Sequence, residues 1–593
     1  MGRAIDAARK EYAPIMATRK KANPEKMNPE KTNPEKKNPE KKNKLRVIPL
    51  GGLDGIGKNM TVIEYGDDMV LIDAGIMFPD DDHPGVDLIL PDYSYVVKRK
   101  DKLRGIIITH GHEDHTGALP FLLKDLGMAV PILGTKLTLG IITGKLTEHK
   151  IKRPKLREVK GGGHVSLGKL SFDFFAVNHS IPDAVGVFVR TPAGNVLHTG
   201  DFKLDQTPLD GRLTDYPALT RFAKAGVTLL MSDSTNAESS GMTRSESEVG
   251  AALREIIGNA KQKVIVASFS SHIHRVQQVC DAAVGAGRKV VVTGRSMVNN
   301  TKIARDLGYL AIDEANIVDA YDAHGLPPED MVIMCTGSQG EPLSALARMA
   351  NGDHRTVQIE RGDTVIFAAT PVPGNEKAVT RVINRLIKAG AEVHHKGTDL
   401  VHVSGHASGQ ELQLMLNLTQ PVYFMPIHGE IRHLAAHKRL AQGIGMYDED
   451  IFILDNGDCL EIDENSARIS EHVESGVVYV DGLSVGDVGQ VVLRDRQLLS
   501  EDGIMTVVLA IDSQTGRLVG EADIVMTGVV VGADAVEFEK AARERVTKTL
   551  AKTSKEGATD QSVVKKAVRE ALSQLLWERW HRRPMIIPVV MEV

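Results

Sequence analysis

The segment THGHEDH, residues 109–115, gathers metal-binding side chains directly after an apolar run. The letters GIII before it predict a buried strand, and His110, His112, Asp114 and His115 follow that strand. Alternate residues of an extended chain point the same way, so His110 and His112 can face one ion. The turn after them would present Asp114 and His115 to a second ion. Imidazole and carboxylate ligands suit Zn²⁺ or Mn²⁺, and two such ions about 3.5–4 Å apart can activate water for hydrolysis.

Two more candidate ligands stand where other expected strands end. His179 ends KLSFDFFAVNH and Asp201 ends NVLHTGD. We expect His179 to complete the ligands of the first ion and Asp201 to bridge both ions. Asp73, in LIDAG, would fix a ligand histidine by a hydrogen bond, with an ordinary strand-end turn as the alternative. The alternative for the whole set is a group of polar loops with chance histidines, which the buried strand before residues 109–115 argues against.

The apolar pattern indicates the elements that must position these side chains. Strands repeatedly end in His or Asp, and active sites collect where a rigid sheet presents side chains from short loops. Expected strands lie at residues 45–52, 69–75, 105–110, 169–179, 195–201, 399–406 and 421–430. In residues 238–390, short apolar strands alternate with helices, which predicts a parallel sheet covered by helices. From residue 486, two strands, two helices and a last strand predict a small α/β domain, with one helix at residues 561–580.

Composition narrows the class of protein. With 593 residues, of which 42% are apolar and 25% charged, the chain should form three or four globular domains. No apolar run is long enough for a membrane span, and the first residues lack the apolar core of a signal peptide. Cys280, Cys335 and Cys459 stand alone, so we expect a reducing, cytoplasmic location.

Residues 23–41 repeat Asn-Pro-Glu-Lys, which predicts a disordered basic tail that is either a solvated spacer or a weak electrostatic tether to RNA.

The ordered set LIDAG, THGHEDH, NHS and TGDF resembles the metallo-β-lactamase fold. That resemblance implies a closing histidine, which appears only at His428 in PIHGE, after a long inserted α/β segment. An insertion in this place is similar to that of the β-CASP nucleases. With GGLDGIGKN, GDFKLDQTP and the segment after residue 486, the sequence resembles the bacterial ribonuclease J family over about residues 45–593. The Asn-Pro-Glu-Lys tail is not part of that pattern.

The resemblance implies an α/β fold, namely a metallo-β-lactamase αββα sandwich with an inserted β-CASP α/β domain and a small C-terminal α/β domain. The expected boundaries are 1–44 for the tail, 45–237 for the first part of the sandwich, 238–390 for the β-CASP domain, 391–485 for the second part with a linker, and 486–593 for the C-terminal domain.

The resemblance also assigns catalytic roles to two residues. Asp233 in MSDSTN and His406 in VSGHAS would lie beside the metals, and one of them would give a proton to the leaving group. The sequence does not decide which is the acid and which the base. The alternatives are that Asp233 only caps a turn and that His406 only orients phosphate. His428 would complete the metal ligands.

Two turns are candidates for binding phosphate. In SFSSHIHRV a strand runs into a helix, so Ser270, Ser271 and His272 are expected at a helix N-terminus, which attracts anions. Ordinary helix capping by the serines is the alternative. The second turn, HVSGH, offers hydroxyl and imidazole donors and consists of His402, Val403, Ser404, Gly405 and His406. By resemblance, the two turns form a pocket for a nucleotide's phosphate, which favours RNA with a 5′-monophosphate.

Two weaker candidates stay open at this level. CTGSQGE, residues 335–341, has the same order of strand, glycine and helix and is either structural or RNA-lining. The acidic run Asp80 to Asp82 fits a solvated loop, and a hard-cation site near Asp87 is the alternative.

The function that the resemblance implies is that of a metal-dependent ribonuclease with 5′-to-3′ exonuclease and endonuclease activity, which prefers 5′-monophosphorylated RNA and acts in RNA maturation and decay. The implied cofactors are two Zn²⁺, with Mn²⁺ or Mg²⁺ as alternatives. The implied partners are RNA, further copies in a homodimer or homotetramer formed through the C-terminal domain, and RNA-decay proteins such as a helicase, with no membrane.

Three other functions compete with this one. They are a β-CASP nuclease acting on DNA or on messenger 3′ ends, a small-molecule metallohydrolase of the same fold, and an RNA-binding scaffold without active metals. The long insertion argues against a small-molecule enzyme, and the full ligand set argues against a scaffold. Between RNA and DNA only the resemblance decides.

Overall fold

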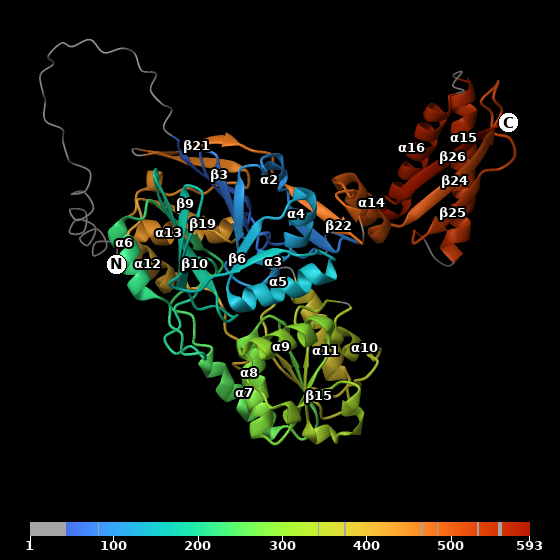
Figure 1. The fold of residues 1–593 in the computed structure, drawn as a ribbon. Coiled ribbons are helices and arrows are strands. Elements are labelled where there is room, and N and C mark those ends of the chain that lie inside the picture. The colour runs from blue at the N-terminus through green and yellow to red at the C-terminus, as the bar shows by residue number, and fades with distance from the viewer. Residues whose placement is uncertain are drawn as a thin grey trace, which may run out of the picture. The chain divides into compact units, whose positions relative to one another are not determined.

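The computed structural model describes residues 43–593 except 81, 342, 373–374, 464–465, 483, 530–532 and 556–559. The expected basic tail therefore lies almost entirely outside the described residues. The chain forms two compact units, one of residues up to Phe78 together with Ile89–Val477, and one of Pro79–Leu88 together with Val478–Val593 (Figure 1). Among the residues that the structure describes, no helix is long and apolar enough to cross a membrane.

Two sheets packed face to face form the centre of the first unit. The first sheet runs in the order β21-β20-β1-β2-β3-β5-β6-β7, with strands β1 (Leu45–Gly51), β2 (Met60–Tyr65), β3 (Asp68–Ile72), β5 (Leu103–Ile107), β6 (Pro131–Gly134), β7 (Lys155–Glu158), β20 (Asp458–Ile462) and β21 (Ala467–His472). The second runs β19-β12-β11-β10-β9-β8, with strands β8 (His164–Leu167), β9 (Leu170–Ala176), β10 (Val185–Thr191), β11 (Gly194–His198), β12 (Leu229–Asp233) and β19 (Tyr423–Ile427). Fully buried side chains such as Val47, Val70, Phe172, Val187 and Met231 fill the space between them.

Helices lie on the outer faces of this sandwich (Figure 1). Beside the first sheet are α2 (Ser94–Lys98), α4 (Leu119–Leu126) and α5 (Lys136–Glu148), and against the second are α6 (Tyr216–Ala225), α12 (Gly409–Thr419) and α13 (Ile431–Gly443). Phe188 of β10 stacks on Phe222 of α6 with ring centroids 4.3 Å apart. Aromatic and aliphatic burial of this kind drives the layered arrangement, because each sheet must cover its second apolar face.

A third sheet, in the inserted segment, is parallel throughout, and this confirms the sequence prediction. Its order is β15-β14-β16-β13-β17-β18, with strands β13 (Val264–Ala267), β14 (Lys289–Val292), β15 (Ile317–Asp319), β16 (Met331–Cys335), β17 (Thr364–Phe367) and β18 (Glu392–His394). Val264 and Val266 face the core shared with α7 (Ser247–Asn259), α8 (Ile273–Gly285) and α9 (Arg295–Leu307). Ile265 and Ala267 face the core shared with α10 (Ala345–Asn351) and α11 (Glu376–Lys388).

The prediction of a strand at residues 399–406 is wrong. This segment belongs to no strand of the structure. Its backbone groups are bound from elsewhere, since the Val401 carbonyl accepts from the Arg275 guanidinium. The next residue after the segment, Ala407, donates its N–H to the Phe202 carbonyl at 2.7 Å. Side chains and single backbone bonds therefore hold a segment for which we expected a neighbouring strand.

The second unit contains the predicted small α/β domain. Its sheet runs β25-β24-β26, with strands β24 (Ile504–Ile511), β25 (Asp523–Thr527) and β26 (Met585–Glu592). The helices are α14 (Gln490–Glu501), which the sequence prediction missed, α15 (Ala533–Lys555) and α16 (Gln561–Trp580). The last of these coincides with the helix predicted at residues 561–580, and it buries Val564, Val568 and Leu572 against the sheet. A hairpin of β22 (Val477–Asp481) and β23 (Ser484–Val485) precedes α14 in the sequence.

Candidate metal centre

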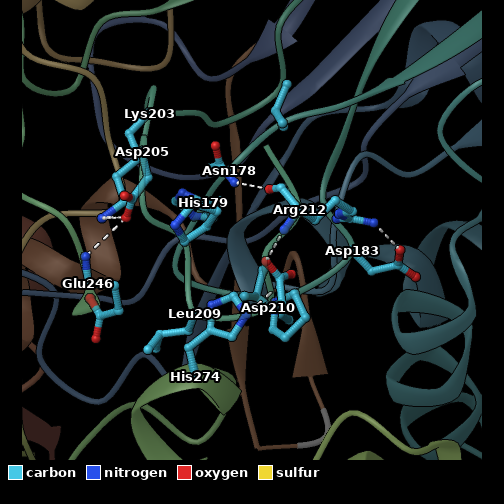
Figure 2. A pocket seen from close by; sticks show the side chains of 14 residues that line it. Asn178, His179, Asp183, Lys203, Asp205, Leu209, Asp210, Arg212, Glu246 and His274 are labelled. Atoms are coloured by element: carbon cyan, nitrogen blue, oxygen red, sulfur yellow. Dashed lines mark hydrogen bonds and ion pairs between the residues drawn. The ribbon is translucent and has the colours of Figure 1, made fainter. Parts of the chain in front are cut away.

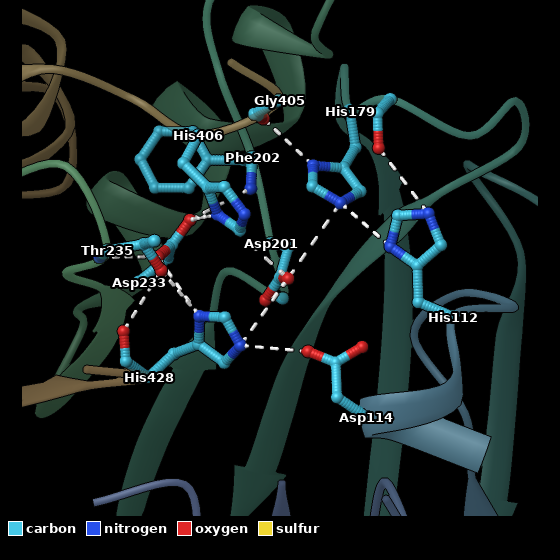
Figure 3. A network of polar contacts seen from close by, with 12 residues as sticks. His112, Asp114, His179, Asp201, Phe202, Asp233, Thr235, Gly405, His406 and His428 are labelled. Atoms are coloured by element: carbon cyan, nitrogen blue, oxygen red, sulfur yellow. Dashed lines mark hydrogen bonds and ion pairs between the residues drawn. The ribbon is translucent and has the colours of Figure 1, made fainter. Parts of the chain in front are cut away.

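The candidate ligands follow the ends of strands and converge at one edge of the sandwich (Figure 3). His110 and His112 follow β5, and the one-turn helix α3 (Glu113–Thr116) begins directly after His112 and carries Asp114 and His115. The other candidates and their strands are His179 after β9, Asp201 after β11 and His428 after β19. The two sheets of the sandwich therefore bring together residues that are up to 318 positions apart, from His110 to His428.

Three imidazole rings form the first group of candidate ligands. His112 Nδ1 lies 3.1 Å from His110 Nε2 and 3.1 Å from His179 Nε2. Ligands placed tetrahedrally around an ion at 2.0–2.1 Å stand about 3.3 Å from one another. Both distances from His112 are close to that spacing, and the ligand atoms of all three residues lie within 4.8 Å of one another, which suits three ligands of a single ion.

Hydrogen bonds on the far side of two rings assign their hydrogen atoms. His179 Nδ1 lies 2.8 Å from the Gly405 carbonyl, which only accepts, so Nδ1 donates and Nε2 keeps its lone pair. The Thr109 hydroxyl donates to a carboxylate behind it and therefore accepts from His110 Nδ1 at 3.0 Å. Burial holds the pKa of both rings well below its ordinary value, so both are neutral. Two lone pairs thus point at the space they share with His112, and this donor set fits a bound cation.

Asp201 is the centre of the second group. Its Oδ2 lies 3.2 Å from His115 Nε2 and 3.7 Å from His428 Nε2. The same oxygen lies 3.8 Å from two imidazole nitrogens of the first group, so Asp201 stands where a bridging carboxylate would stand. Asp114 completes the second group, with its Oδ2 3.2 Å from His428 Nε2 and 3.5 Å from His115 Nε2.

Asp73 supports the site from behind. It is 2% exposed and has a φ of +61°, a conformation that is uncommon for a residue other than glycine. Its carboxylate accepts from His115 Nδ1 at 2.7 Å and from the Thr109 N–H at 2.8 Å. A carboxylate in this position fixes the ring and leaves its second nitrogen for an ion.

Asp233, His406 and His428 form a polar network next to Asp201 (Figure 3). His406 Nδ1 lies 2.8 Å from Asp233 Oδ2, and the other Asp233 oxygen accepts from the Thr235 hydroxyl at 2.8 Å. Thr235 Oγ1 also lies 2.6 Å from His428 Nδ1. The structure thus places both residues that the resemblance assigns to catalysis beside the candidate ligands.

The two groups of candidate ligands differ in their electrostatics. Burial lowers the pKa of His112 to about 4. Burial also lowers the pKa of His428, but Asp201, Asp114 and Asp233 outweigh it and raise that pKa to about 10. The first group is therefore a set of neutral donors, whereas the second contains carboxylates whose field favours positive charge.

The two turns expected to bind phosphate lie against each other. The rings of His272 and His402 are 6.4 Å apart between centroids. His272 is the N-cap of α8, and its Nδ1 accepts from the Arg275 N–H at 3.3 Å. The helix is therefore capped by His272 and not by Ser270 or Ser271, which corrects the simple capping interpretation of these serines.

Arg275 is fully buried and ties the two turns together. Its Nε donates to Glu246 Oε1 at 3.0 Å and to Gln278 Oε1 at 3.1 Å. Its Nη1 donates to the carbonyls of Ala368, at 3.1 Å, and of Val401. Since Val401 directly precedes HVSGH, the guanidinium couples that turn to the helix that follows the first turn.

Sequence reasoning missed several residues that position the site. Asn59 Nδ2 lies 3.1 Å from His115 Nε2 and donates to the Asp114 carbonyl at 3.2 Å. Asn236 Nδ2 donates to Ser404 Oγ at 2.7 Å. Both asparagines stand inside segments that we had noted, GGLDGIGKN and MSDSTN, but their spacing alone indicates no partner.

A small cavity is lined by His179 and by charged residues that pair with one another (Figure 2). Arg212 Nη1 lies 2.6 Å from Asp183 Oδ1, and His274 Nε2 lies 3.6 Å from Asp210 Oδ2. Because these charges already have partners within the protein, the cavity is better described as support for the loop of His179 than as a ligand site.

The two weaker candidates have structural uses. Gln339, within residues 335–341, donates from its amide to the Thr370 carbonyl at 3.0 Å, and this favours a structural role for that segment. Asp87 Oδ2 accepts from the Gly482 N–H at 2.7 Å. In the part of the chain that the structure describes, Asp87 belongs to none of the clusters of three or more potential metal ligands.

Four segments of the chain match families of known proteins. Residues 53–239 match the Metallo-beta-lactamase superfamily, 261–386 the Ribonuclease J beta-CASP domain, 390–454 the Zn-dependent metallo-hydrolase RNA specificity domain, and 491–593 the Ribonuclease J C-terminal domain. These matches confirm the expected fold class, a metallo-β-lactamase sandwich with an inserted β-CASP domain and a C-terminal domain.

Curated relatives are similar over nearly the whole chain. Ribonuclease J of Mycolicibacterium smegmatis is 44% identical over 549 residues, which cover 93% of this chain and 97% of that protein. Ribonuclease J of Corynebacterium glutamicum is 42% identical over 546 residues, which cover 92% of this chain and 76% of that protein. Ribonuclease J2 of Bacillus subtilis is 41% identical over 550 residues, which cover 93% of this chain and 99% of that protein.

Proposed function

The chain belongs to the ribonuclease J family, and on that premise we propose that it hydrolyses the phosphodiester bonds of RNA with metal ions bound at the edge of the sandwich. The observation that carries this proposal is the convergence of histidine and aspartate side chains in two adjoining groups. The match of residues 390–454 to an RNA specificity domain supports RNA as the substrate.

The donor sets support two ions with different surroundings. The ligands of the first would be His110, His112 and His179, and those of the second Asp114, His115 and His428, with Asp201 shared. Two divalent ions, Zn²⁺ with Mn²⁺ or Mg²⁺ as alternatives, would supply an activated water and stabilise charge on the attacking and leaving oxygens. The protein contributes rigidity, because the hydrogen bonds of Asp73, Thr109 and Gly405 fix the rings before any substrate arrives.

His406 is better placed than Asp233 to give a proton to the leaving oxygen. Asp233 is 1% exposed, and both of its oxygens accept hydrogen bonds, from His406 and from Thr235. The His406 side chain is 20% exposed and uses Nδ1 for Asp233, which leaves Nε2 free to face a substrate. We therefore assign proton donation to His406 and orientation of its ring to Asp233. When the 3′-oxygen leaves and takes this proton, the product ends are a 5′-phosphate and a 3′-hydroxyl.

One substrate panel tests the proposed reaction. A single labelled oligonucleotide is prepared as RNA and as DNA, each with a 5′-monophosphate, a 5′-triphosphate or a 5′-hydroxyl, and is incubated with the protein in Mn²⁺ or Zn²⁺. We expect RNA to be cleaved, with the monophosphate form cleaved fastest. Faster cleavage of DNA would favour another β-CASP nuclease, and cleavage of neither would contradict the proposal.

The preference for a 5′-monophosphate would come from the two adjoining turns. Ser271 and Ser404 are half-buried residues on these turns, and a hydrogen bond from a hydroxyl to a charged group is worth roughly 1.5–3 kcal/mol. Replacing both by alanine should lower the preference for linear monophosphorylated RNA at least about tenfold, or about 1.4 kcal/mol. Cleavage within a circular RNA, which has no end, should change much less. Equal losses on both substrates would assign the serines to the reacting phosphate or to folding.

The C-terminal domain offers a surface for self-association. On the face of its sheet opposite the buried residues, Val525, Ile587, Val589 and Met591 are 39–55% exposed. Exposed apolar side chains gathered on one face of a sheet favour an interface at that face. We propose a homodimer or homotetramer formed through it.

Val589→Asp should shift the mass measured by light scattering towards the monomer, whereas the control Val536→Asp, at a position 73% exposed on α15, should not. An unchanged mass in Val589→Asp would contradict this interface.

A cytoplasmic location is part of the proposal. Cys280, Cys335 and Cys459 are all buried and free, which suits a reducing compartment. RNA-decay partners such as a helicase follow only from the family, and co-purification from cells with and without nuclease treatment would test for them.

A further inference from the structure

A serine in the turn HVSGH has both lone pairs of its hydroxyl occupied. Ser404 Oγ accepts from Asn236 Nδ2 at 2.7 Å and from the His406 N–H at 3.1 Å. A serine hydroxyl has two acceptor sites and one hydrogen. With both acceptor sites filled from within the protein, the hydroxyl can bind a further group only by donating to it.

A second hydrogen bond fixes the orientation of the Asn236 side-chain amide. The second hydrogen of Nδ2 goes to the His406 carbonyl at 3.0 Å. A flipped amide would set its oxygen against that carbonyl, so the observed orientation is the one that the surrounding backbone accepts. Asn236 is half-buried and directly follows Thr235, which donates a hydrogen bond to Asp233. Adjacent residues of MSDSTN therefore bond to Asp233 and to the turn of Ser404.

Ser404 is a half-buried residue, and among the described residues no acceptor is recorded for the hydrogen of its hydroxyl. A hydroxyl that only donates matches a phosphate dianion, which only accepts. It is a poor match for a 5′-hydroxyl end, which carries no charge to strengthen the bond. The chemistry at this turn therefore favours a terminal phosphate.

We propose that Asn236 is a positioning residue that holds the Ser404 hydroxyl as a donor and thereby sets the selectivity for a 5′-phosphate over a 5′-hydroxyl end. This inference rests on the proposed function, because it concerns how the same enzyme reads the end of its RNA. It adds a residue whose recorded side-chain bonds go to Ser404 and to the His406 carbonyl, so that its effect on the RNA end would pass through Ser404.

In the other turn, Ser270 also accepts a hydrogen bond from an asparagine. Asn300, on α9, donates from Nδ2 to Ser270 Oγ at 3.1 Å. Here the structure records one donor to the serine, whereas Ser404 has two, so the Ser270 hydroxyl keeps an acceptor site and more rotational freedom. The same isosteric change at Asn300 should therefore affect selectivity less than at Asn236.

The test uses Asn236→Asp in the full chain, with Asn300→Asp as the matched control. An aspartate oxygen in place of Nδ2 would accept the Ser404 hydrogen and turn it away from the pocket. The quantity measured is the ratio of kcat/KM for 5′-monophosphate RNA to kcat/KM for the same RNA with a 5′-hydroxyl. We expect this ratio to fall at least about tenfold in Asn236→Asp, or about 1.4 kcal/mol, and about threefold or less in Asn300→Asp.

A double-mutant cycle shows whether Asn236 acts through Ser404. In a Ser404→Ala background, Asn236→Asp should change the ratio less than twofold, since no hydroxyl is left to turn. Asn236→Ala, which adds no charge, should lower the ratio in the same direction and serves if the aspartate variant does not fold. A ratio unchanged in both Asn236 variants, or an equal fall with and without Ser404, would overturn the inference. If the wild type itself shows no preference for the monophosphate, the failure lies with the proposed terminal-phosphate pocket.

Discussion

The candidate metal centre and the two turns that we propose bind a terminal phosphate, residues 270–272 and 402–406, are built in different ways. The candidate metal ligands stand just after the ends of strands, and further hydrogen bonds fix their rings, as when Thr109 bonds to His110 and Gly405 bonds to His179. The turn at 402–406 follows no strand, and its position depends on side chains that reach it from far along the sequence, such as Arg275 and Asn236. Damage to the first region should abolish all cleavage, and damage to the second should change which RNA ends are preferred.

The contrast extends to electrostatics. The candidate metal ligands include the carboxylates Asp114 and Asp201, whose negative charge favours a bound cation. The turns instead present neutral donors, because burial holds the pKa of His272 and of His402 well below its ordinary value. The two regions suit different parts of the proposed substrate, because cations would neutralise the reacting phosphate and a separate set of donors would hold a terminal one.

The largest effect is expected from His112→Ala. It removes the ring that contacts both His110 and His179, so bound metal should be lost and cleavage of linear and circular RNA alike should fall by about 10⁴-fold or more, roughly 5.5 kcal/mol in the barrier. Metal content by elemental analysis and rates on both substrates measure this. His164→Ala, at a largely exposed histidine, is the control and should retain both. Turnover near that of the wild type in His112→Ala would remove this residue from the assignment.

A smaller effect is expected from Arg275→Met, which breaks the contact between the two turns. It leaves the Glu246 carboxylate, 5% exposed, without its cation, and removing one partner of a buried pair costs about 3–5 kcal/mol. The shift of the denaturant midpoint measures the loss, and the selectivity for a 5′-phosphate should fall with it.

A companion variant separates charge from packing. Arg275→Met combined with Glu246→Gln removes the unpaired charge and should recover part of the lost stability without restoring selectivity, since the bond to Val401 is still missing. Stability within about 0.5 kcal/mol of the wild type in Arg275→Met alone would show that the turns are held by other contacts.

The smallest effect is expected from deletion of residues 1–42. No candidate ligand lies in that stretch, so turnover on short RNA should stay within a few-fold. If the basic repeats bind RNA, the dependence of affinity on salt should flatten, because fewer counterions are released. Binding measured at several salt concentrations decides this, and an unchanged slope would make the repeats a spacer.

The alternation of short apolar strands with helices predicted the parallel sheet of the inserted segment, and the helical spacing of apolar residues predicted the helix Gln561–Trp580, because both rest on local periodicity. The strand at residues 399–406 was predicted wrongly for the same reason. VHV looks like a strand, but its backbone bonds to the Arg275 side chain, and apolar alternation cannot reveal such a partner. The assignment of individual ligands stays a prediction, which the distances between the side chains support. The domain boundaries also stay a prediction.

The sequence by itself determined which residues are of types that bind metal, and that they follow the ends of predicted strands. His110, His112 and His179 are recognisable because metal-binding side chains directly after buried strands are rare without a use. Only the tertiary structure decided that Asp201 lies between the two groups, that Asp233 contacts His406 Nδ1, and that Asn236 fills the second acceptor site of Ser404. Those roles depend on distances of about 3 Å between residues far apart in the chain, and hydrogen-bond geometry at that scale is set by packing, not by local pattern.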